Sequence, residues 1–381
     1  MRSPSLEARA LLAAAAIASG SCRERATSAE LVVGAYFSFS GADSTFGEES
    51  REGIDLAVEE ANAAGGIKGQ RVKVLYEDDK STTQEASQKV RQLVDRDRVL
   101  AILGEIASSR SLAGGLVANT SKVPMVSPSA TALEVTQGRE WVFRTCFTDD
   151  QQGQIVARFV KEELGRTKVG IFFAAQDTYS SGLARAFRTE AQRIGLEIVI
   201  EKGYQKGETN YRTYLSQLKA AGAEMVFVPN YYGEMVLIAR QARELGIEGS
   251  RFIGGDGWDS QNLLSGAGEE LEGAFFTNHY APDVPWENSK RFYEVFRARY
   301  GHEPSSLAAQ GYDSARVVFD AMARAPEPTR AEIRNALTQT KDFKGATGTI
   351  TIGADRNAKK PVVVVRIHDK QFTFHREMPA Q

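Results

Sequence analysis

Two clusters of hydroxyl side chains each follow a short apolar run and could together bind a small anion. Ser108 and Ser109 come after the apolar run Leu100–Leu103. Ser127–Thr131 (Ser-Pro-Ser-Ala-Thr) ends the next apolar run, Val123–Val126. The two runs predict buried strands, and the segment between them predicts a helix that begins at the first serines. Ligands of open α/β sheets bind just beyond the carboxyl ends of the strands, and free N–H groups at a helix N-terminus suit a carboxylate. The segment therefore predicts part of a pocket for a small anionic or zwitterionic molecule.

A purely structural role also fits these hydroxyl groups. Ser is a preferred helix N-cap, and Ser-Pro-Ser is common in turns. Either cluster alone would be ordinary capping or turn chemistry. Two clusters at equivalent ends of neighbouring strands favour a ligand site, but the sequence leaves both explanations open.

The rest of the chain alternates strand and helix patterns with short connections, which is typical of doubly wound parallel sheets. Glycines follow several helical runs, as glycines that end helices do. The chain has more strand–helix units than a single sheet usually contains, so we predict an α/β fold of two similar lobes. The predicted strands are Leu31–Ala35, Val72–Glu77, Leu100–Leu103, Val123–Val126, Lys168–Phe173, Leu196–Glu201, Met225–Pro229, Arg251–Ile253, Gly273–His279, Gly348–Ile352 and Val362–Ile367. The predicted helices include Ser50–Ala64, Thr83–Asp95, Asp150–Leu164, Ser180–Ile194, Asn210–Ala221, Tyr232–Leu245, Glu287–Tyr300, Ser306–Arg324 and Arg330–Gln339.

Composition narrows the classes of function. The 381 residues are enough for two domains, and 42% hydrophobic with 25% charged residues is typical of soluble globular proteins. The net charge is −2 and no basic run is present, so we expect no nucleic-acid partner. Beyond the first thirty residues, no apolar stretch approaches the length of a membrane span.

The N-terminal segment has the layout of a secretory signal peptide. Arg2 and Arg9 flank a polar start, and Ala10–Ala18 is an apolar core too short to span a bilayer. Small residues, Ser19–Ser21, follow it. The alternative is a cytosolic protein with an Ala-rich helix at its start.

The small residues before Cys22 resemble a bacterial lipobox, in which the Cys becomes the lipidated first residue of the mature protein. Ser19 stands where that pattern usually has Leu, and Glu7 is unusual so early. The alternative is cleavage near Ala26–Ala29 and a free periplasmic protein. We predict that residues 1–30 are a signal peptide or lipoprotein tether, and that the mature protein is periplasmic or anchored outside the cytoplasm.

No motif for catalysis, a metal or a cofactor stands out, so we expect a protein that is not an enzyme and has no catalytic residues. None of the histidines lies in a Gly-x-Ser-x-Gly, His-Glu-x-x-His or comparable setting. No Cys/His spacing suggests a zinc site, and Cys146 lies between apolar residues, where a buried hydrophobic role is expected. The histidines are His279, His302, His368 and His375.

Several segments occur together in the order and spacing of a known family. They are VVGAYFSFSGADSTFGEESREGIDLAVEEANAAGGIKG, ILGEIASS, VSPSATALEVT, FRTCFTDDQQG, DTYSSGLARAF and NYYGEMVLIARQARELG. On these segments the chain, from about Leu31 to its end, resembles the type I periplasmic binding proteins of the leucine/isoleucine/valine-binding branch. Each segment is weakly specific alone, and together they are fairly specific.

The resemblance implies two Rossmann-like lobes with parallel central sheets, joined by a hinge of three chain crossings, with the ligand trapped between them. It implies an N-terminal lobe of residues 31–148 plus 279–347. The C-terminal lobe would then contain residues 149–278 plus 348–381.

The resemblance also implies ligand contacts from the first lobe. Ser108 matches a serine that holds the ligand carboxylate through its hydroxyl and the helix N-terminal backbone. Ser129 and Thr131 match positions that bind the ammonium and carboxylate groups. Phe46 lies where the family places an aromatic ring over the ligand, although a ring packed on its own lobe is the alternative.

From the second lobe the resemblance implies Tyr179, Tyr231 and Asp256 as ligand residues. Each follows a predicted strand and so lies at a strand end that faces the cleft. A tyrosine adds both apolar area and a polar group, and a carboxylate can neutralise a ligand ammonium that would be costly to bury unpaired. The alternative for Asp256 is an ordinary turn residue in Gly-Gly-Asp-Gly.

The chain departs from the family at three positions. The branched-chain amino-acid binders have Glu at the position of Asp256, and Trp258 two residues later could narrow or reshape the pocket. Ala107 stands where one partner of the family's disulfide would be. With these departures we expect an amino-acid-like ligand. Specificity for branched-chain amino acids stays open, because some relatives bind amides or aromatic acids.

The sequence therefore predicts a receptor of an ABC importer that closes about a hinge on an amino acid or related solute. We expect a monomer that delivers this solute to a membrane permease. Three alternatives are a ligand-sensing module for a signalling partner, a binder of an amide or aromatic acid, and an enzyme of sugar or nucleotide derivatives on a Rossmann-like fold.

Overall fold

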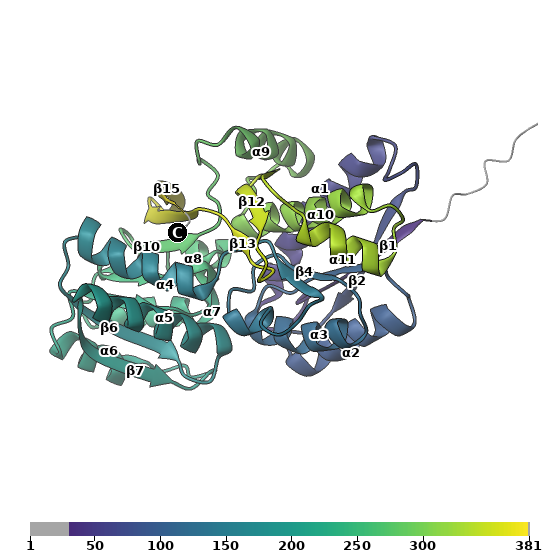
Figure 1. Ribbon diagram of the computed structural model, residues 1–381. Helices are drawn as coiled ribbons and strands as arrows, with labels where there is room; N and C mark the ends of the chain where they lie inside the picture. Colours follow the sequence, from purple (N-terminus) through teal and green to yellow (C-terminus); the bar gives the residue numbers. More distant parts are fainter. Residues whose placement is uncertain (1–29, 380–381) are drawn as a thin grey trace, which may run out of the picture.

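The structure contains two α/β halves that lie side by side, each with a central sheet covered by helices (Figure 1). This computed structural model describes residues 30–379. The first half has a five-stranded sheet with the order β2-β1-β3-β4-β5, in which all neighbouring strands are parallel. Both faces of such a sheet are covered, so its central strands are apolar throughout. The strands are β1 (Leu31–Phe37), β2 (Val72–Asp78), β3 (Ala101–Leu103), β4 (Met125–Ser127) and β5 (Val142–Arg144).

Helices from two distant parts of the chain cover the first sheet. Gly53 lies in α1 (Ser44–Ala63) and Ala308 in α10 (Ser306–Arg324). A Cβ atom on Gly53 would lie 1.8 Å from the carbonyl oxygen of Ala308, so a glycine is needed where these two helices cross. This close approach joins the later segment to the first half. The helices are α1 (Ser44–Ala63), α2 (Thr83–Asp95), α3 (Ser108–Thr120), α9 (Glu287–Tyr300), α10 (Ser306–Arg324) and α11 (Arg330–Thr338).

The second half has a seven-stranded sheet with the order β15-β14-β10-β9-β8-β6-β7. The pairs from β7 to β10 are parallel, and the last two strands of the chain extend the sheet in the antiparallel sense. The strands are β6 (Lys168–Ala174), β7 (Glu197–Tyr204), β8 (Met225–Val228), β9 (Phe252–Gly254), β10 (Phe275–Asn278), β14 (Val362–His368) and β15 (Gln371–Met378). The helices are α4 (Asp149–Arg158), which continues as a π-helical turn, α5 (Thr178–Ile194), α6 (Arg212–Ala220), α7 (Tyr232–Glu244) and α8 (Gln261–Ala267).

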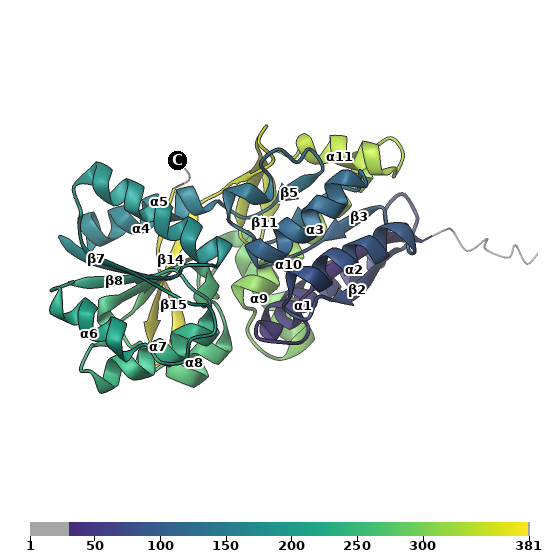
Figure 2. The same cartoon turned by 90° about the horizontal axis from the view of Figure 1, so that it is seen from below.

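The chain passes between the halves three times, at residues 145–148, 279–286 and 360–361. A small antiparallel sheet of β11 (Phe343–Gly345), β12 (Gly348–Ile352) and β13 (Ala358–Lys359) precedes the third passage. The backbone N–H of Arg144 in β5 donates to the carbonyl of Arg356, so this small sheet is tied to the edge of the first half. Both views place it near the junction of the halves (Figures 1 and 2).

The predicted fold class is confirmed, with the refinement that the second sheet is mixed rather than wholly parallel. Helix α1 begins at Ser44, earlier than the predicted start at Ser50, because the polar residues of its first turns carry no helical apolar period. The strands β5, β11 and β13 were missed because each is short and includes a basic residue, which interrupts the apolar run. The polar edge strand β15 was missed because most of its side chains are exposed or half-buried.

The predicted lobe boundaries stay a prediction. The strand β12, placed in the second lobe by the resemblance, pairs with β11 and β13 and does not join the seven-stranded sheet. The seven-stranded sheet instead receives β14 and β15 from the end of the chain.

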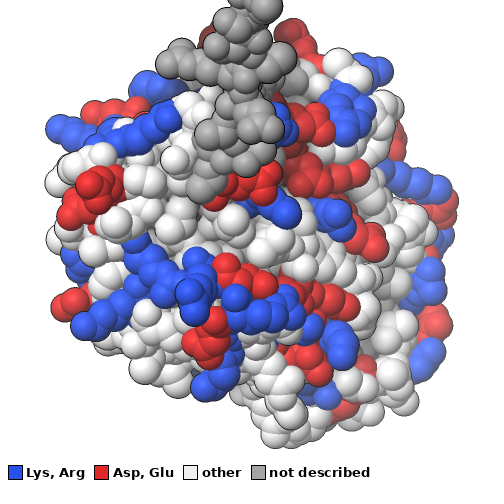
Figure 3. Space-filling model, turned by 90° about the vertical axis from the view of Figure 1, so that its right-hand side faces the viewer, with Lys and Arg blue, Asp and Glu red and all other residues white. Residues whose placement is uncertain are grey.

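Basic and acidic side chains are interspersed on the face of the first half shown in Figure 3. Within residues 30–379, none of the helices is both long and apolar enough to cross a membrane.

The crossing of α1 and α10 can be tested at Gly53. The change Gly53→Ala is expected to lower the free energy of unfolding by about 1–3 kcal/mol, because the added methyl group overlaps the backbone of Ala308. Gly233→Ala in α7 is the matched control, since open space surrounds that position and Ala favours a helix by up to about 1 kcal/mol. Urea denaturation of both variants measures the difference. A Gly53→Ala protein as stable as the wild type would contradict this crossing.

Candidate ligand-binding site

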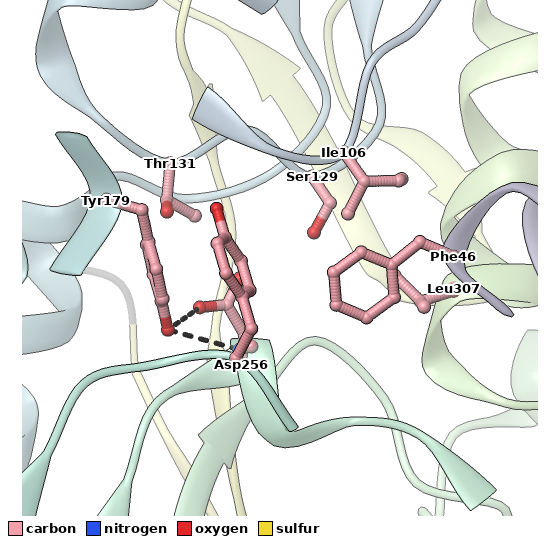
Figure 4. A pocket seen from close by; sticks show the side chains of 9 residues that line it. Phe46, Ile106, Ser129, Thr131, Tyr179, Asp256 and Leu307 are labelled. Atoms are coloured by element: carbon pink, nitrogen blue, oxygen red, sulfur yellow. Dashed lines mark hydrogen bonds between the residues drawn. The ribbon is translucent and has the colours of Figure 1, made fainter. Parts of the chain in front are cut away.

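A pocket lies between the two halves, at the carboxyl ends of strands from both sheets (Figure 4). It receives side chains from each half. The first half contributes Phe46, Ile106, Ser129, Thr131 and Leu307, and the second contributes Tyr179, Tyr231, Asp256 and Gly257. Six of the seven residues predicted to bind a ligand therefore line one pocket.

The seventh predicted residue, Ser108, does not line the pocket. Its hydroxyl oxygen accepts a hydrogen bond from the backbone N–H of Ala132 at 3.1 Å. This bond ties the first residue of α3 to the loop after β4, which bears Ser129 and Thr131. A hydroxyl that accepts one hydrogen bond still has its own hydrogen to donate.

Ser127, the last residue of β4, fixes the loop that follows it through two hydrogen bonds. Its hydroxyl donates to the backbone carbonyl of Glu105 at 2.7 Å and accepts from the backbone N–H of Ala130 at 2.9 Å. The hydroxyl group of Ser129 then points into the pocket, as Figure 4 shows. The hydroxyl clusters recognised in the sequence are thus partly structural, through Ser108 and Ser127, and partly exposed to the pocket.

A buried ion cluster supports the turn that carries Ile106. The Arg110 guanidinium donates to Asp43 at 2.7 Å, and its Nε lies 3.1 Å from Glu105 and 3.7 Å from Asp79. The carboxylate of Glu105 also accepts from the N–H of Ala107 at 2.6 Å. Burial raises the pKa of Glu105 to about 8, against the opposing effect of Arg110.

On the opposite wall, three donors hold the carboxylate of Asp256. Its Oδ1 accepts from the hydroxyl of Tyr179 and from Nε2 of Gln152, each at 2.9 Å. Its Oδ2 lies 3.1 Å from Nε2 of His279. Burial lowers the pKa of His279 to about 4, so the neutral ring donates its Nε2 hydrogen to the carboxylate. The hydroxyl of Tyr179 in turn accepts from the N–H of Gly257 at 3.1 Å.

Aromatic rings complete the pocket. The rings of Tyr179 and Tyr231 are stacked, with centroids 5.1 Å apart and planes at 22°. Phe46 meets Tyr231 edge to face at 5.7 Å and Tyr232 at 5.4 Å. Phe46 belongs to α1 and the tyrosines to the second half, so these contacts cross the cleft. The ring of Phe46 lines the pocket, as predicted, and does not pack only on its own half.

Sequence reasoning missed several residues of the site. Ile106 and Leu307 line the pocket without any polar signal, and Gln152 and His279 act on Asp256 from segments distant in sequence. Trp258 itself does not line the pocket. Its indole N–H donates to the carbonyl of Val228 and to the side chain of Asn230, behind the pocket wall.

The structure describes one of the two cysteines, Cys146. Cys146 is buried, as predicted, and burial raises the pKa of its thiol to about 12. Its thiol donates to the carbonyl of Ala130 at 3.4 Å. Cys22, the predicted lipidation site, lies outside the described residues.

Two more acidic side chains, one on each half, have raised pKa values. Glu49 lies on α1, and Asp259 lies at the start of the loop before α8; nearby, the hydroxyl groups of Thr45 and Ser260 are 3.4 Å apart. Burial raises the pKa of Glu49 to about 8 and that of Asp259 to about 7, and the negative charge of Asp259 raises the pKa of Glu49 further.

The two walls of the pocket suit opposite charges. Hydroxyl groups and free N–H groups of the first half suit a carboxylate, and the carboxylate of Asp256 suits a cation. The apolar side chains of Phe46, Ile106 and Leu307 lie on the first-half side and suit a short hydrocarbon group. The arrangement therefore fits a small zwitterion with an apolar part.

Comparison with known proteins identifies the family. A model of the periplasmic binding protein family matches residues 30–371 of the chain. The chain belongs to the periplasmic binding protein family. The match confirms the resemblance inferred from the sequence, and membership implies a location outside the cytoplasm.

Relatives of this periplasmic binding protein include an amino acid binding protein of Pseudomonas aeruginosa, which is 31% identical over 309 residues and covers 80% of this chain and 81% of that relative. Among solved structures, a leucine binding protein, LivK, from Thermotoga maritima has a TM-score of 0.87 and 34% identity, over 92% of this chain and 99% of that chain. The branched-chain amino acid transporter substrate binding protein LivJ from Streptococcus pneumoniae, in complex with isoleucine, has a TM-score of 0.86 and 32% identity, over 93% and 99% of the chains. These relatives are named as binding proteins rather than enzymes.

The Glu49–Asp259 pair predicts a pH-dependent stability. Because both pKa values are raised by folding, the stability from these groups is complete below the unfolded values near about pH 4 and is lost as the pH rises through 7 and 8. Wild-type protein is expected to lose more stability between pH 5.5 and 8.5 than Glu49→Gln does, with a difference of about 1–3 kcal/mol. Thermal unfolding of both proteins at the two pH values measures this difference. Equal losses in the two proteins would contradict the burial of Glu49 as an acid.

Proposed function

We propose that this periplasmic binding protein is the solute-binding receptor of an ABC importer and that it binds a small aliphatic amino acid between its halves. The observation that carries the proposal is the Asp256 carboxylate, held by three donors opposite the hydroxyl groups of Ser129 and Thr131. A carboxylate with its acceptor sites oriented in advance can pair with a buried ammonium at low cost.

The other end of the ligand would meet the first half. The hydroxyl groups of Ser129 and Thr131 would donate to the ligand carboxylate, and the N-terminus of α3, which begins at Ser108, would lie behind them. The positive end of the α3 dipole favours an anion at this place.

The hydrocarbon part of the ligand would contact Phe46, Ile106 and Leu307, while Tyr179 and Tyr231 would close over it. The aromatic rings that meet across the pocket favour a short side chain over a large one. Relatives that are named for leucine or that hold isoleucine support the same choice. We infer that closure of the halves presents the loaded protein to a membrane permease.

Comparing leucine with an analogue that lacks the amino group tests the two ends of the site separately. Asp256→Asn is expected to weaken leucine binding by about 30-fold or more, because a buried ammonium would lose its charged partner. Binding of 4-methylpentanoate, which keeps the carboxylate and the side chain, is expected to change by less than about threefold. Isothermal titration calorimetry of the wild type and the variant measures both affinities.

The exposed change Asp369→Asn serves as the charge-matched control, since this carboxylate lies far from the pocket at the turn between β14 and β15. Equal affinity of the wild type and Asp256→Asn for leucine would refute the role of Asp256. A wild-type protein that binds an aromatic acid or an amide, and no aliphatic amino acid, would refute the proposed ligand.

We infer that Cys22 carries a lipid anchor in the mature protein. In the native host, the wild type is expected in the membrane fraction, and Cys22→Ser is expected to leave that fraction. Intact mass spectrometry of the membrane-extracted protein measures the attached acyl chains. A wild type recovered without acyl chains and cleaved near Ala26–Ala29 would support the free periplasmic alternative.

A further inference from the structure

The three donors to Asp256 come from different parts of the molecule. Tyr179 lies on α5 and Gln152 on α4, both inside the second half. His279 is the first residue of the second passage between the halves, directly after β10. The carboxylate proposed to bind the ligand is thus hydrogen-bonded to the hinge itself.

His279 is also fixed to another passage of the chain. Its ring is fully buried and stacked on the ring of Phe147, with centroids 3.7 Å apart and planes at 19°. Phe147 lies in the first passage, between β5 and α4. Phe147 packs in turn with Ile155 and with Val362, which begins β14 after the third passage. All three passages therefore meet around this ring pair.

The chemistry of His279 allows a single orientation at Asp256. A neutral imidazole has one N–H donor and one acceptor nitrogen, and a carboxylate only accepts. The Nε2 hydrogen therefore faces Asp256, and Nδ1 is left as a buried acceptor without a partner among the described residues. A buried acceptor without a partner costs free energy, so packing alone does not explain a histidine at this position. An apolar ring would fill the same space without that cost.

We propose that His279, supported by Phe147, is a positioning residue that holds Asp256 in its ligand-binding orientation and links that orientation to the hinge. The inference rests on the proposed function, because the group that Asp256 would meet is a ligand ammonium. His279 itself touches no ligand and lines no part of the pocket. Movement of the two passages against each other would shift the stacked rings and with them the donor to Oδ2.

Two substitutions separate the hydrogen bond from the packing. His279→Phe keeps an aromatic ring for the stack on Phe147 and removes the donor. His279→Gln supplies an amide N–H at a similar distance from the backbone and removes the ring. Loss of the donor frees Oδ2 and lets the carboxylate turn, while the contacts to the ligand carboxylate are unchanged.

Calorimetric titration with leucine and with 4-methylpentanoate is the decisive measurement. His279→Phe is expected to weaken leucine binding about 10-fold and to change 4-methylpentanoate binding by less than twofold. His279→Gln is expected to keep leucine affinity within about threefold of the wild type. In an Asp256→Asn background, His279→Phe is expected to have no further effect on leucine, because the two residues act through one hydrogen bond. Equal weakening of both ligands, or unchanged leucine affinity, would overturn the proposal.

A ligand-free measurement distinguishes failure of this inference from failure of the proposed function. In nitrogen NMR spectra of the free protein, His279 is expected to be neutral with its hydrogen on Nε2, and that proton signal is expected to shift in Asp256→Asn. If the wild type binds neither probe ligand but the signal behaves this way, the proposed ligand is wrong and the positioning bond stands. A hydrogen on Nδ1, or a signal that Asp256→Asn does not move, would overturn the positioning role whatever the ligand.

Discussion

The site depends on the burial of one carboxyl group, that of Asp256. A carboxylate removed from water needs several hydrogen bonds to offset its desolvation, and here they come from α4, α5 and the second chain passage. Those three elements must therefore lie in fixed register at the end of β9. The turn allows this because residue 257 is a glycine; a Cβ atom there would lie 2.6 Å from the carbonyl oxygen of Asn230. The same requirement places Tyr179 where its ring can stack on Tyr231 and form one wall of the pocket.

The first half would bind the opposite charge, that of the ligand carboxylate. It offers hydroxyl groups to an anion, although Asp43, Asp79 and Glu105 lie close behind them around Arg110. Burial raises the pKa values of Asp79 and Glu105, and the Arg110 guanidinium opposes that rise. The positive charge of Arg110 offsets part of the negative charge of this cluster. A ligand carboxylate would therefore meet a wall whose acidic groups are paired with Arg110, with the N-terminus of α3 directed at it.

Local pattern was enough to predict the α/β class, most helices and the hydroxyl clusters, because strand ends and such clusters are encoded over short segments. Four other lining residues, Phe46, Tyr179, Tyr231 and Asp256, were predicted from the family resemblance and not from local pattern. The residues that lie behind the site were not predictable in the same way. Gln152 and His279 reach Asp256 from 104 and 23 residues away in sequence, and nothing in their neighbourhoods marks them as its partners. Ser108 has a hydroxyl typical of a site, yet in the structure that hydroxyl is bonded to the backbone of Ala132. The missed short strands each include a basic residue, and β15 is a polar edge strand, so none of them shows a clear apolar pattern.

The polar contacts between the two halves contribute little to the free energy of closure, so a ligand must add to the aromatic contacts of Phe46 with Tyr231 and Tyr232. The polar contacts between the halves near the pocket include the Thr45–Ser260 hydroxyl pair at 3.4 Å and the exposed Arg185–Glu134 ion pair at 3.3 Å. Exposed pairs of this kind contribute about 0–1 kcal/mol each. A ligand shifts an equilibrium between two conformations only by its difference in affinity for them. A zwitterion would reach Ser129 and Thr131 on one half and Asp256 on the other only when the cleft is closed, so its two charged ends would supply that difference. A molecule with a single charged end would engage one wall and would stabilise the closed form less than a zwitterion does.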